Sequence, residues 1–96
     1  MTWVFEITDK TRRKIHLSTE RWKHIVKEHP DISNKIEHIK ETLISPILVK
    51  NSKYDTRVRF YYKYYKYRLE YLLVSVKYLN GNGFIITAFY TKKLTR

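Results

Sequence analysis

The side chains in this chain best suited to acid–base chemistry are its four histidines, which stand in a strongly basic sequence. His24 and His29 fall in the first helical segment, five residues apart, whereas a zinc pair on one helix face needs a spacing of four. A metal-dependent nuclease needs clustered carboxylates, but most acidic residues here lie in the helical half, and there is no cysteine. The sequence therefore predicts neither a metal site nor a cofactor.

Histidine, lysine, arginine, tyrosine and threonine together suit the metal-independent cleavage of RNA. In that reaction the 2′-hydroxyl attacks the phosphorus, a base removes its proton, an acid protonates the leaving 5′-oxygen, and cations stabilise the phosphorane. His24 lies one helical turn from both Glu20 and Glu28, and an imidazole can take either proton role near neutral pH. We predict His24 or His29 as the proton-transfer residue and expect the other two histidines, His16 and His38, to be surface residues.

The charge of the chain predicts its partner. The formal net charge is +11, and nine tyrosines are present, most of them between lysines and arginines. Such a charge attracts polyanions, so RNA is the expected partner, and an acidic antitoxin or inhibitor protein is a further one. No segment approaches the roughly 20 apolar residues that span a bilayer, and no signal peptide is visible. We expect a cytoplasmic protein without membrane contact, as a monomer or weak dimer.

The periodicity of apolar residues predicts one α+β domain over residues 1–96. Helical spacing predicts a first helix from Ser18 or Thr19 to His29, and a second from Asp31 or Ser33 to Pro46. The period then changes to two, and strands are predicted over residues 47–50, 57–66, 69–78 and 84–90, with a hairpin turn at 80–83 and a short strand at 3–7. The expected architecture is two N-terminal helices packed on one face of a four-stranded antiparallel sheet.

Two helices can cover only one face of such a sheet, so the other face should be open. Alternation within the strands places a set of cations and aromatic rings on this open face: Arg57, Arg59, Tyr61, Lys63, Tyr65, Tyr71 and Lys77. Such a surface binds phosphates and stacks bases. The alternative interpretation is structural, because tyrosine favours strands and lysine keeps sheet edges soluble.

Several segments resemble one family of nucleases. The segments IHLS (15–18), ERWKHI (20–25) and EHPD (28–31) resemble the opening of the phage-type members of the barnase–EndoU–colicin–RelE (BECR) superfamily. The segments IEHIKETLISP (36–46), LLVSVK (72–77) and FIITAFYT (84–91) resemble its second helix and last two strands. The resemblance implies a RelE-like sheet and a metal-independent endoribonuclease that leaves a 2′,3′-cyclic phosphate, as in members that are toxins.

The family has functional residues on its first helix, a central strand and its last strand. By motif these positions fall on His24 or His29, Lys77 and Thr87, and the neighbouring Tyr90 and Thr91 are included with them. Phe89-Tyr90 departs from the family, where Tyr-Pro is common at these two positions.

The turn between the last two strands decides whether Lys77 and Thr87 share a face. They do so if odd-numbered residues pair with odd, as a loop of three or five residues allows. A two-residue turn at Asn80-Gly81 would instead send Thr87 to the other face. Two other functions remain open: a non-catalytic domain that binds RNA or single-stranded DNA, and a basic module that docks an acidic protein.

Overall fold

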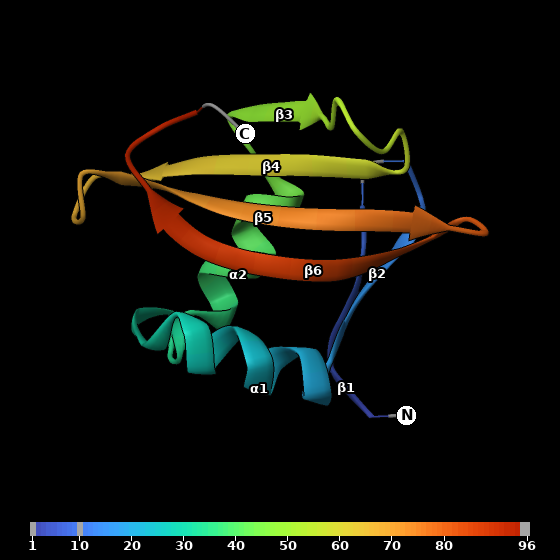
Figure 1. Cartoon of the computed structure of the whole chain (residues 1–96), viewed down its shortest axis with the longest axis horizontal. Helices are drawn as coiled ribbons and strands as arrows, with labels where there is room; N and C mark the ends of the chain where they lie inside the picture. The colour runs from blue at the N-terminus through green and yellow to red at the C-terminus, as the bar shows by residue number, and fades with distance from the viewer. Residues whose placement is uncertain (1, 10, 95–96) are drawn as a thin grey trace.

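The computed structural model describes residues 2–9 and 11–94, which form one sheet, two α-helices and a short 3-10 turn (Figure 1). The elements in chain order are β1 (Trp3–Thr8), β2 (Lys14–Ser18), α1 (Thr19–Glu28), η1 (Pro30–Ile32), α2 (Ile36–Ile44), β3 (Leu48–Asn51), β4 (Val58–Tyr65), β5 (Glu70–Leu79) and β6 (Asn82–Thr91). The strands lie in the order β1-β2-β6-β5-β4-β3.

The expectation of a four-stranded antiparallel sheet behind two N-terminal helices is wrong. The described chain forms a six-stranded mixed sheet, because a hairpin of β1 and β2 precedes α1 and joins the sheet through parallel pairing of β2 with β6. This pairing spans only Lys14 to His16 of β2, opposite Asn82 to Phe84 of β6. Ile15 and Leu17 of β2 are completely buried, so this short strand belongs to the core.

The first helix begins and ends as the sequence predicts. Ser18 caps α1, since its Oγ accepts a hydrogen bond from the backbone N–H of Arg21 at 3.1 Å, and Pro30 follows its end. The predicted cap of the second helix is wrong. Residues 30–32 form the 3-10 turn η1, and α2 starts at Ile36 without a side-chain cap.

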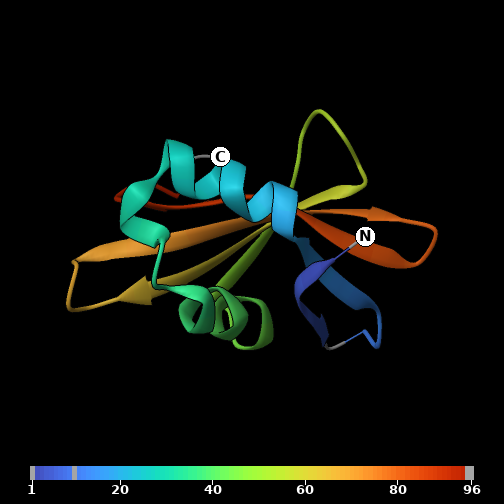
Figure 2. The ribbon, with the colours of Figure 1, turned by 90° about the horizontal axis from the view of Figure 1, so that it is seen from below.

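α2 covers one face of the sheet, whereas α1 lies along its β6 edge, and both helices contribute side chains to the same core. α2 packs across β4 and β5, whereas α1 contacts β6 and the β1–β2 hairpin. Only the first residues of β6, Asn82 to Phe84, pair with β2. The remaining edge of β6 is not covered by β2, and α1 packs there. Figure 2 looks onto this edge and shows α2 on one side of the strands. We call the side covered by α2 the rear face and the opposite side the front face.

The predicted alternation in β4 is inverted. Tyr61 and Tyr65 lie on the rear face, 6% and 9% exposed, and Tyr61 pairs with the core residue Val74. The intervening residue Tyr62 therefore lies on the front face. The sequence could not decide between these arrangements because aromatic residues occupy both faces of this strand.

A β-bulge controls which residues of β6 reach the front face. Asn80 and Gly81, with φ of 52° and 81°, form a two-residue turn that pairs Leu79 with Asn82. Ile86 is then an extra residue, so the register shifts and Thr87 pairs with Ser75. The predicted turn at 80–83 is confirmed, but the inference that a two-residue turn removes Thr87 from the face of Lys77 is wrong, because the bulge restores odd-with-odd pairing.

Candidate active site

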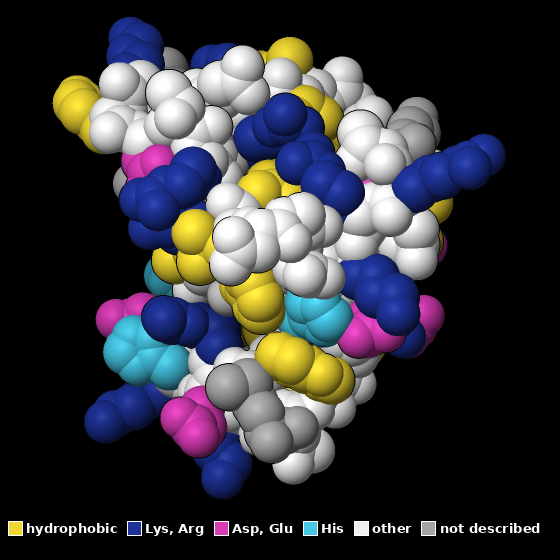
Figure 3. Space-filling model, turned by 90° about the vertical axis from the view of Figure 1, so that its right-hand side faces the viewer, with side chains coloured by type: hydrophobic (Ala, Val, Ile, Leu, Met, Phe, Trp, Pro, Cys, Tyr) yellow, Lys and Arg dark blue, Asp and Glu magenta, His cyan; other side chains and the backbone are white. Residues whose placement is uncertain are grey.

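Lys77 and Arg21 line a hollow of about 290 Å³ between the start of α1 and the β5–β6 hairpin. A shallower hollow of about 380 Å³ lies next to it along α1 and contains His24. The two hollows share Ser18 and Arg21, so they adjoin. Figure 3 looks onto the side of the molecule where the β5–β6 hairpin lies and shows apolar side chains exposed between lysines and arginines, with histidine and acidic side chains beside them.

Lys77 shares a carboxylate with a second cation. Its Nζ lies 3.3 Å from Oδ2 of Asp55, while Nε of Arg57 donates a hydrogen bond of 3.1 Å to Oδ1 of the same residue. The hydrogen bonds from the side chain and backbone of Arg57, with a further one from Lys77, lower the pKa of Asp55 to about 2. Asp55 is therefore ionised at neutral pH and holds Lys77 and Arg57 side by side at one end of the front face.

His24 is exposed and has a carboxylate partner. Its side chain is 56% exposed, and Nε2 lies 3.3 Å from Oε1 of Glu28, one helical turn further on. Arg21 lies almost one turn before it and lines the same hollow. An exposed imidazole beside a carboxylate is suited to proton transfer next to a bound anion.

His29 is held against the sheet at the other end of α1. Its backbone N–H donates to the carbonyl oxygen of Ile25, and its ring stacks on Phe89 with the ring centroids 5.0 Å apart. Phe89 pairs with Leu73 in the same register that pairs Thr87 with Ser75, so Phe89 and Thr87 are successive front-face residues of β6. His29 therefore lies along the same strand edge as Thr87, with its ring packed rather than exposed in the hollow.

The front face gathers part of the predicted site. Lys77 lies two residues from Ser75 on one face of β5, about 7 Å along the strand, and Ser75 faces Thr87 across the β5–β6 pair. Tyr71 and Thr91 also lie on this face, and Arg57, which precedes β4, is joined to Lys77 through Asp55. Tyr71 packs edge-on against Tyr64 at 5.1 Å, toward the end of the face away from Lys77. Thr91 lies opposite Tyr71, and its Oγ1 accepts a hydrogen bond of 3.1 Å from the backbone of Lys93.

The other predicted RNA-binding residues lie on the rear face and are engaged there: Arg59, Tyr61, Lys63 and Tyr65. Lys63 donates to the carbonyl oxygen of Ser45, and the guanidinium of Arg59 lies over the ring of Tyr78. Their assignment to an open face is corrected, because α2 covers this part of the sheet.

The buried tyrosines of the rear face have their hydroxyls engaged in hydrogen bonds. Tyr65 donates to Oε1 of Glu41 at 2.7 Å, and Tyr78 donates to Oδ2 of Asp9 at 3.0 Å while its oxygen lies 2.5 Å from that of Tyr61. Burial raises the pKa of Tyr65 and of Tyr78, and the neighbouring hydroxyl and carboxylate groups add to the shift. These hydroxyls stay protonated and serve the fold.

Tyr90 also lies on the rear face, away from Lys77. Its hydroxyl is 3.1 Å from that of Tyr67 and 3.4 Å from Nδ1 of His38, and the guanidinium of Arg68 lies 3.8 Å from its ring centroid. Burial and the bond to Tyr67 raise the pKa of Tyr90. His38 stacks on Tyr65 at 4.3 Å and is half-buried, so the expectation that it is a surface residue holds only in part.

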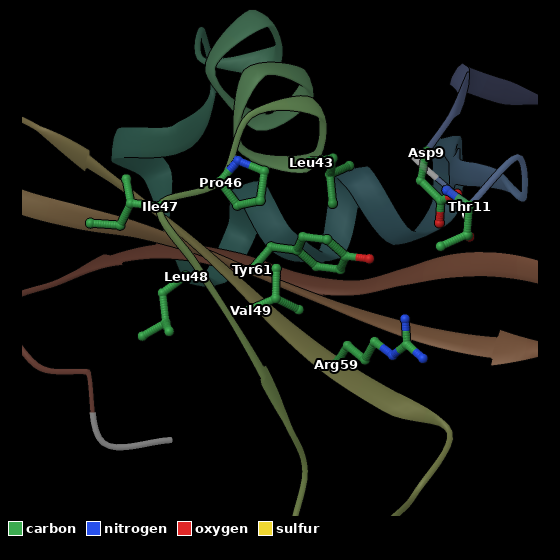
Figure 4. Close-up of a pocket in the computed structure, with 9 residues that line it drawn as sticks. All are labelled: Asp9, Thr11, Leu43, Pro46, Ile47, Leu48, Val49, Arg59 and Tyr61. Atoms are coloured by element: carbon green, nitrogen blue, oxygen red, sulfur yellow. Dashed lines mark hydrogen bonds between the residues drawn. The ribbon is translucent and has the colours of Figure 1, made fainter.

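A further hollow, of about 390 Å³, lies on the rear side beside the end of α2 (Figure 4). Figure 4 shows apolar side chains at one end and Asp9, Thr11 and Arg59 at the other. Burial opposes the ionisation of Asp9, but hydrogen bonds from Thr11, Arg13 and Tyr78 outweigh it and lower the pKa of this carboxyl. Asp9 thereby fixes the β1–β2 turn to β5, which is a structural role.

Sequence reasoning missed two residues beside Lys77. His16 was expected at the surface but is buried, with its ring 4.5 Å from that of Trp3 and its Nδ1 3.0 Å from Oε2 of Glu6. Arg21 was assigned no role from the sequence. It lies in the first turn of α1, and its backbone N–H donates a hydrogen bond to the N-cap residue Ser18. The pairing of β2 with β6 that brings both to the hairpin joins residues far apart in sequence, so no local pattern reveals it.

Comparison of the chain with family models, curated proteins and solved structures found no match. Within residues 2–9 and 11–94, no group of three or more histidine, aspartate and glutamate side chains is arranged to hold a metal ion. The helices of this described part are too short or too polar to cross a membrane. The geometry of the front face is therefore the basis for a functional proposal.

Proposed function

We propose that this chain is a metal-independent endoribonuclease that holds the scissile phosphate at the end of the front face nearest Lys77. The observation that carries the proposal is the bulge at Ile86, which turns Thr87 to the same face of the sheet as Lys77. Lys77 in turn lines a hollow together with Arg21. Bulges of this kind commonly redirect a side chain next to an active site. The resemblance to the BECR superfamily supports the same reaction.

Each proposed residue has a separate role in the attack of the 2′-hydroxyl on phosphorus. His24 removes the proton of the 2′-hydroxyl, and the 2′-oxygen forms a bond to phosphorus. The bond between phosphorus and the 5′-oxygen breaks, and the 5′-oxygen takes a proton from water. Lys77 and Arg21 stabilise the charge that develops on the phosphorane, and Thr87 donates a hydrogen bond to a non-bridging oxygen. The products are a 2′,3′-cyclic phosphate and a 5′-hydroxyl.

His24 is preferred to His29 as the base because of its surroundings. The ring of His24 is exposed in a hollow that it shares with Arg21, whereas the ring of His29 is stacked on Phe89. Tyr90 has no part in the proposed step, since its hydroxyl is engaged by Tyr67 on the rear face.

Cleavage of labelled RNA in the presence of EDTA tests this function. We expect cuts in RNA that end in 2′,3′-cyclic phosphate, and none in the same sequence made of DNA, which lacks the nucleophile. His24→Gln should lower the rate about 10²- to 10⁴-fold, as expected for loss of a general base. His38→Gln, at a histidine on the rear side, is the matched control and should leave the rate unchanged.

Each remaining outcome points to a defined alternative. RNA that binds tightly but stays intact contradicts the nuclease and favours a binding domain. Cleavage that survives His24→Gln but is lost in His29→Gln moves the base to His29. A chain that ignores RNA but forms a stable complex with an acidic protein favours the docking module.

A further inference from the structure

The hollow beside Lys77 has two chemically different parts. Its walls are mostly apolar, with the rings of Trp3 and Phe84, whereas the charged side chains of Lys77 and Arg21 also line it. We propose that this hollow binds one nucleobase of a single-stranded RNA, next to the phosphate held by Lys77 and Arg21. The proposal rests on the proposed function, because it names the substrate group that this site selects.

The aromatic wall of the hollow is fixed in place. The rings of Trp3, His16 and Phe84 form a triangle, in which the ring centroid of His16 lies 4.5 Å from that of Trp3 and 5.3 Å from that of Phe84, and those of Trp3 and Phe84 are 6.3 Å apart. The ring of His16 is nearly parallel to that of Phe84 at 25°, whereas the ring of Trp3 is tilted against both. Glu6 lies 3.0 Å from one nitrogen of His16, and Asn82 lies 3.4 Å from the other. Three rings packed against one another offer a pre-organised aromatic wall on which a base can stack.

The size and charge of the hollow favour a nucleotide. Its volume of about 290 Å³ is at the small end of ligand sites, which suits a single base with its sugar better than a base pair. A ligand must present a flat apolar group to Trp3 and Phe84 and an anionic group to Lys77 and Arg21. A nucleoside monophosphate has both groups next to each other, whereas a simple anion has only the second.

The position of the hollow gives the bound base a role. It adjoins the hollow of His24 through Ser18 and Arg21, so a base bound here belongs to a nucleotide beside the scissile phosphate. The enzyme would then cut next to a base that it has accepted, and the aromatic wall would determine sequence preference.

Tryptophan fluorescence tests the pocket without any cleavage step. Trp22→Phe leaves Trp3 as the only tryptophan of the chain. In this variant we expect the monophosphates of uridine, cytidine, adenosine and guanosine to change the Trp3 emission with saturation, and at least one to bind about tenfold more tightly than ribose 5-phosphate, the contribution expected of one base–aromatic stack. Inorganic phosphate should behave like ribose 5-phosphate.

Two phenylalanines of β6 provide a matched pair of substitutions in the Trp22→Phe background. Phe84→Ala removes a wall of the hollow and should lower nucleotide affinity about tenfold. Phe89→Ala removes a ring from the same strand outside the hollow and should leave it unchanged. If thermal melting shows that Phe84→Ala is unfolded, Phe84→Leu keeps an apolar side chain without the ring and replaces it in the comparison.

The pocket and the nuclease fail in different ways. Ribose 5-phosphate that binds as tightly as every nucleotide, or equal effects of substitution at Phe84 and Phe89, overturns the base pocket even if RNA is cleaved. Nucleotides that bind as predicted to a chain that leaves RNA intact support the pocket and overturn the nuclease.

Discussion

The two faces of the sheet both carry tyrosines and cations, but they use them differently. On the rear face Tyr78 and Tyr65 are buried and hydrogen-bonded to the carboxylates of Asp9 and Glu41. On the front side Lys77 and His24 are paired with carboxylates that stay partly in solvent. Exposed ion pairs contribute little stability, so a phosphate can replace them at low cost. On both faces the type of side chain is the same, but its partners differ. Buried hydrogen bonds to carboxylates indicate a structural residue, whereas exposed ion pairs leave a side chain available to a ligand.

The sharpest test of this contrast compares one lysine from each face. Lys77→Ala should lower the rate of RNA cleavage about 10²-fold or more, because it removes a cation from the developing phosphorane. Lys63→Ala on the rear face should leave the rate unchanged. The measurement is the single-turnover rate in EDTA, and equal losses in the two variants would remove the distinction between the faces.

A tyrosine from each face tests the structural half of the contrast. Tyr78→Phe should lower the free energy of unfolding by about 1–3 kcal/mol, since it leaves the buried carboxylate of Asp9 without one of its donors. Tyr64→Phe, at an exposed front-face residue, should change it little. Urea unfolding measures both, and a similar loss in Tyr64→Phe would contradict the division of roles.

Asp55 should restrain RNA binding. Asp55→Asn removes the anion that engages Lys77 and Arg57, so RNA affinity should rise about two- to fivefold at low salt, the range of an exposed ion pair. Asp31→Asn, which breaks the pair with Arg68, is the control and should not change it. A decrease in affinity in Asp55→Asn would show that the carboxylate positions the cations.

The pKa of Asp55 sets the pH range of this effect. Its folded pKa of about 2 lies below the ordinary 3.8, so the ion pair stabilises the folded chain above about pH 4, and this contribution is lost as the pH falls through 2. Between pH 5 and 8 the charge of Asp55 should be constant. A ¹³C titration of its carboxyl signal measures this, and a midpoint near 3.8 would contradict the observed contacts.

The smallest expected effect is on salt dependence. Arg21→Gln should reduce the slope of log affinity against log salt by about one, because one phosphate contact is lost. Arg59→Gln on the rear face should leave the slope unchanged. RNA-binding isotherms at several salt concentrations provide the slopes, and equal changes in both variants would mean that the cations act only through net charge.

The sequence allowed prediction of the features that depend on neighbouring residues. Ser18, Pro30 and the Asn80-Gly81 turn act through local backbone geometry, and the structure confirms each of them. The bulge at Ile86 and the pairing of β2 with β6 depend on contacts between distant segments, so the mixed sheet and the buried state of His16 could not be predicted. The rear position of Tyr61 was hidden because β4 is aromatic on both sides.

Amide and side-chain NMR shifts during titration with an RNA that carries 2′-O-methyl groups, and so cannot be cleaved, test most directly whether the front face binds RNA. We expect the largest changes at Arg21, His24, Lys77 and Thr87, saturating together, with little change at Tyr61 and Tyr65. Changes concentrated on the rear face, or spread over all lysines and arginines alike, would contradict a phosphate site at the front.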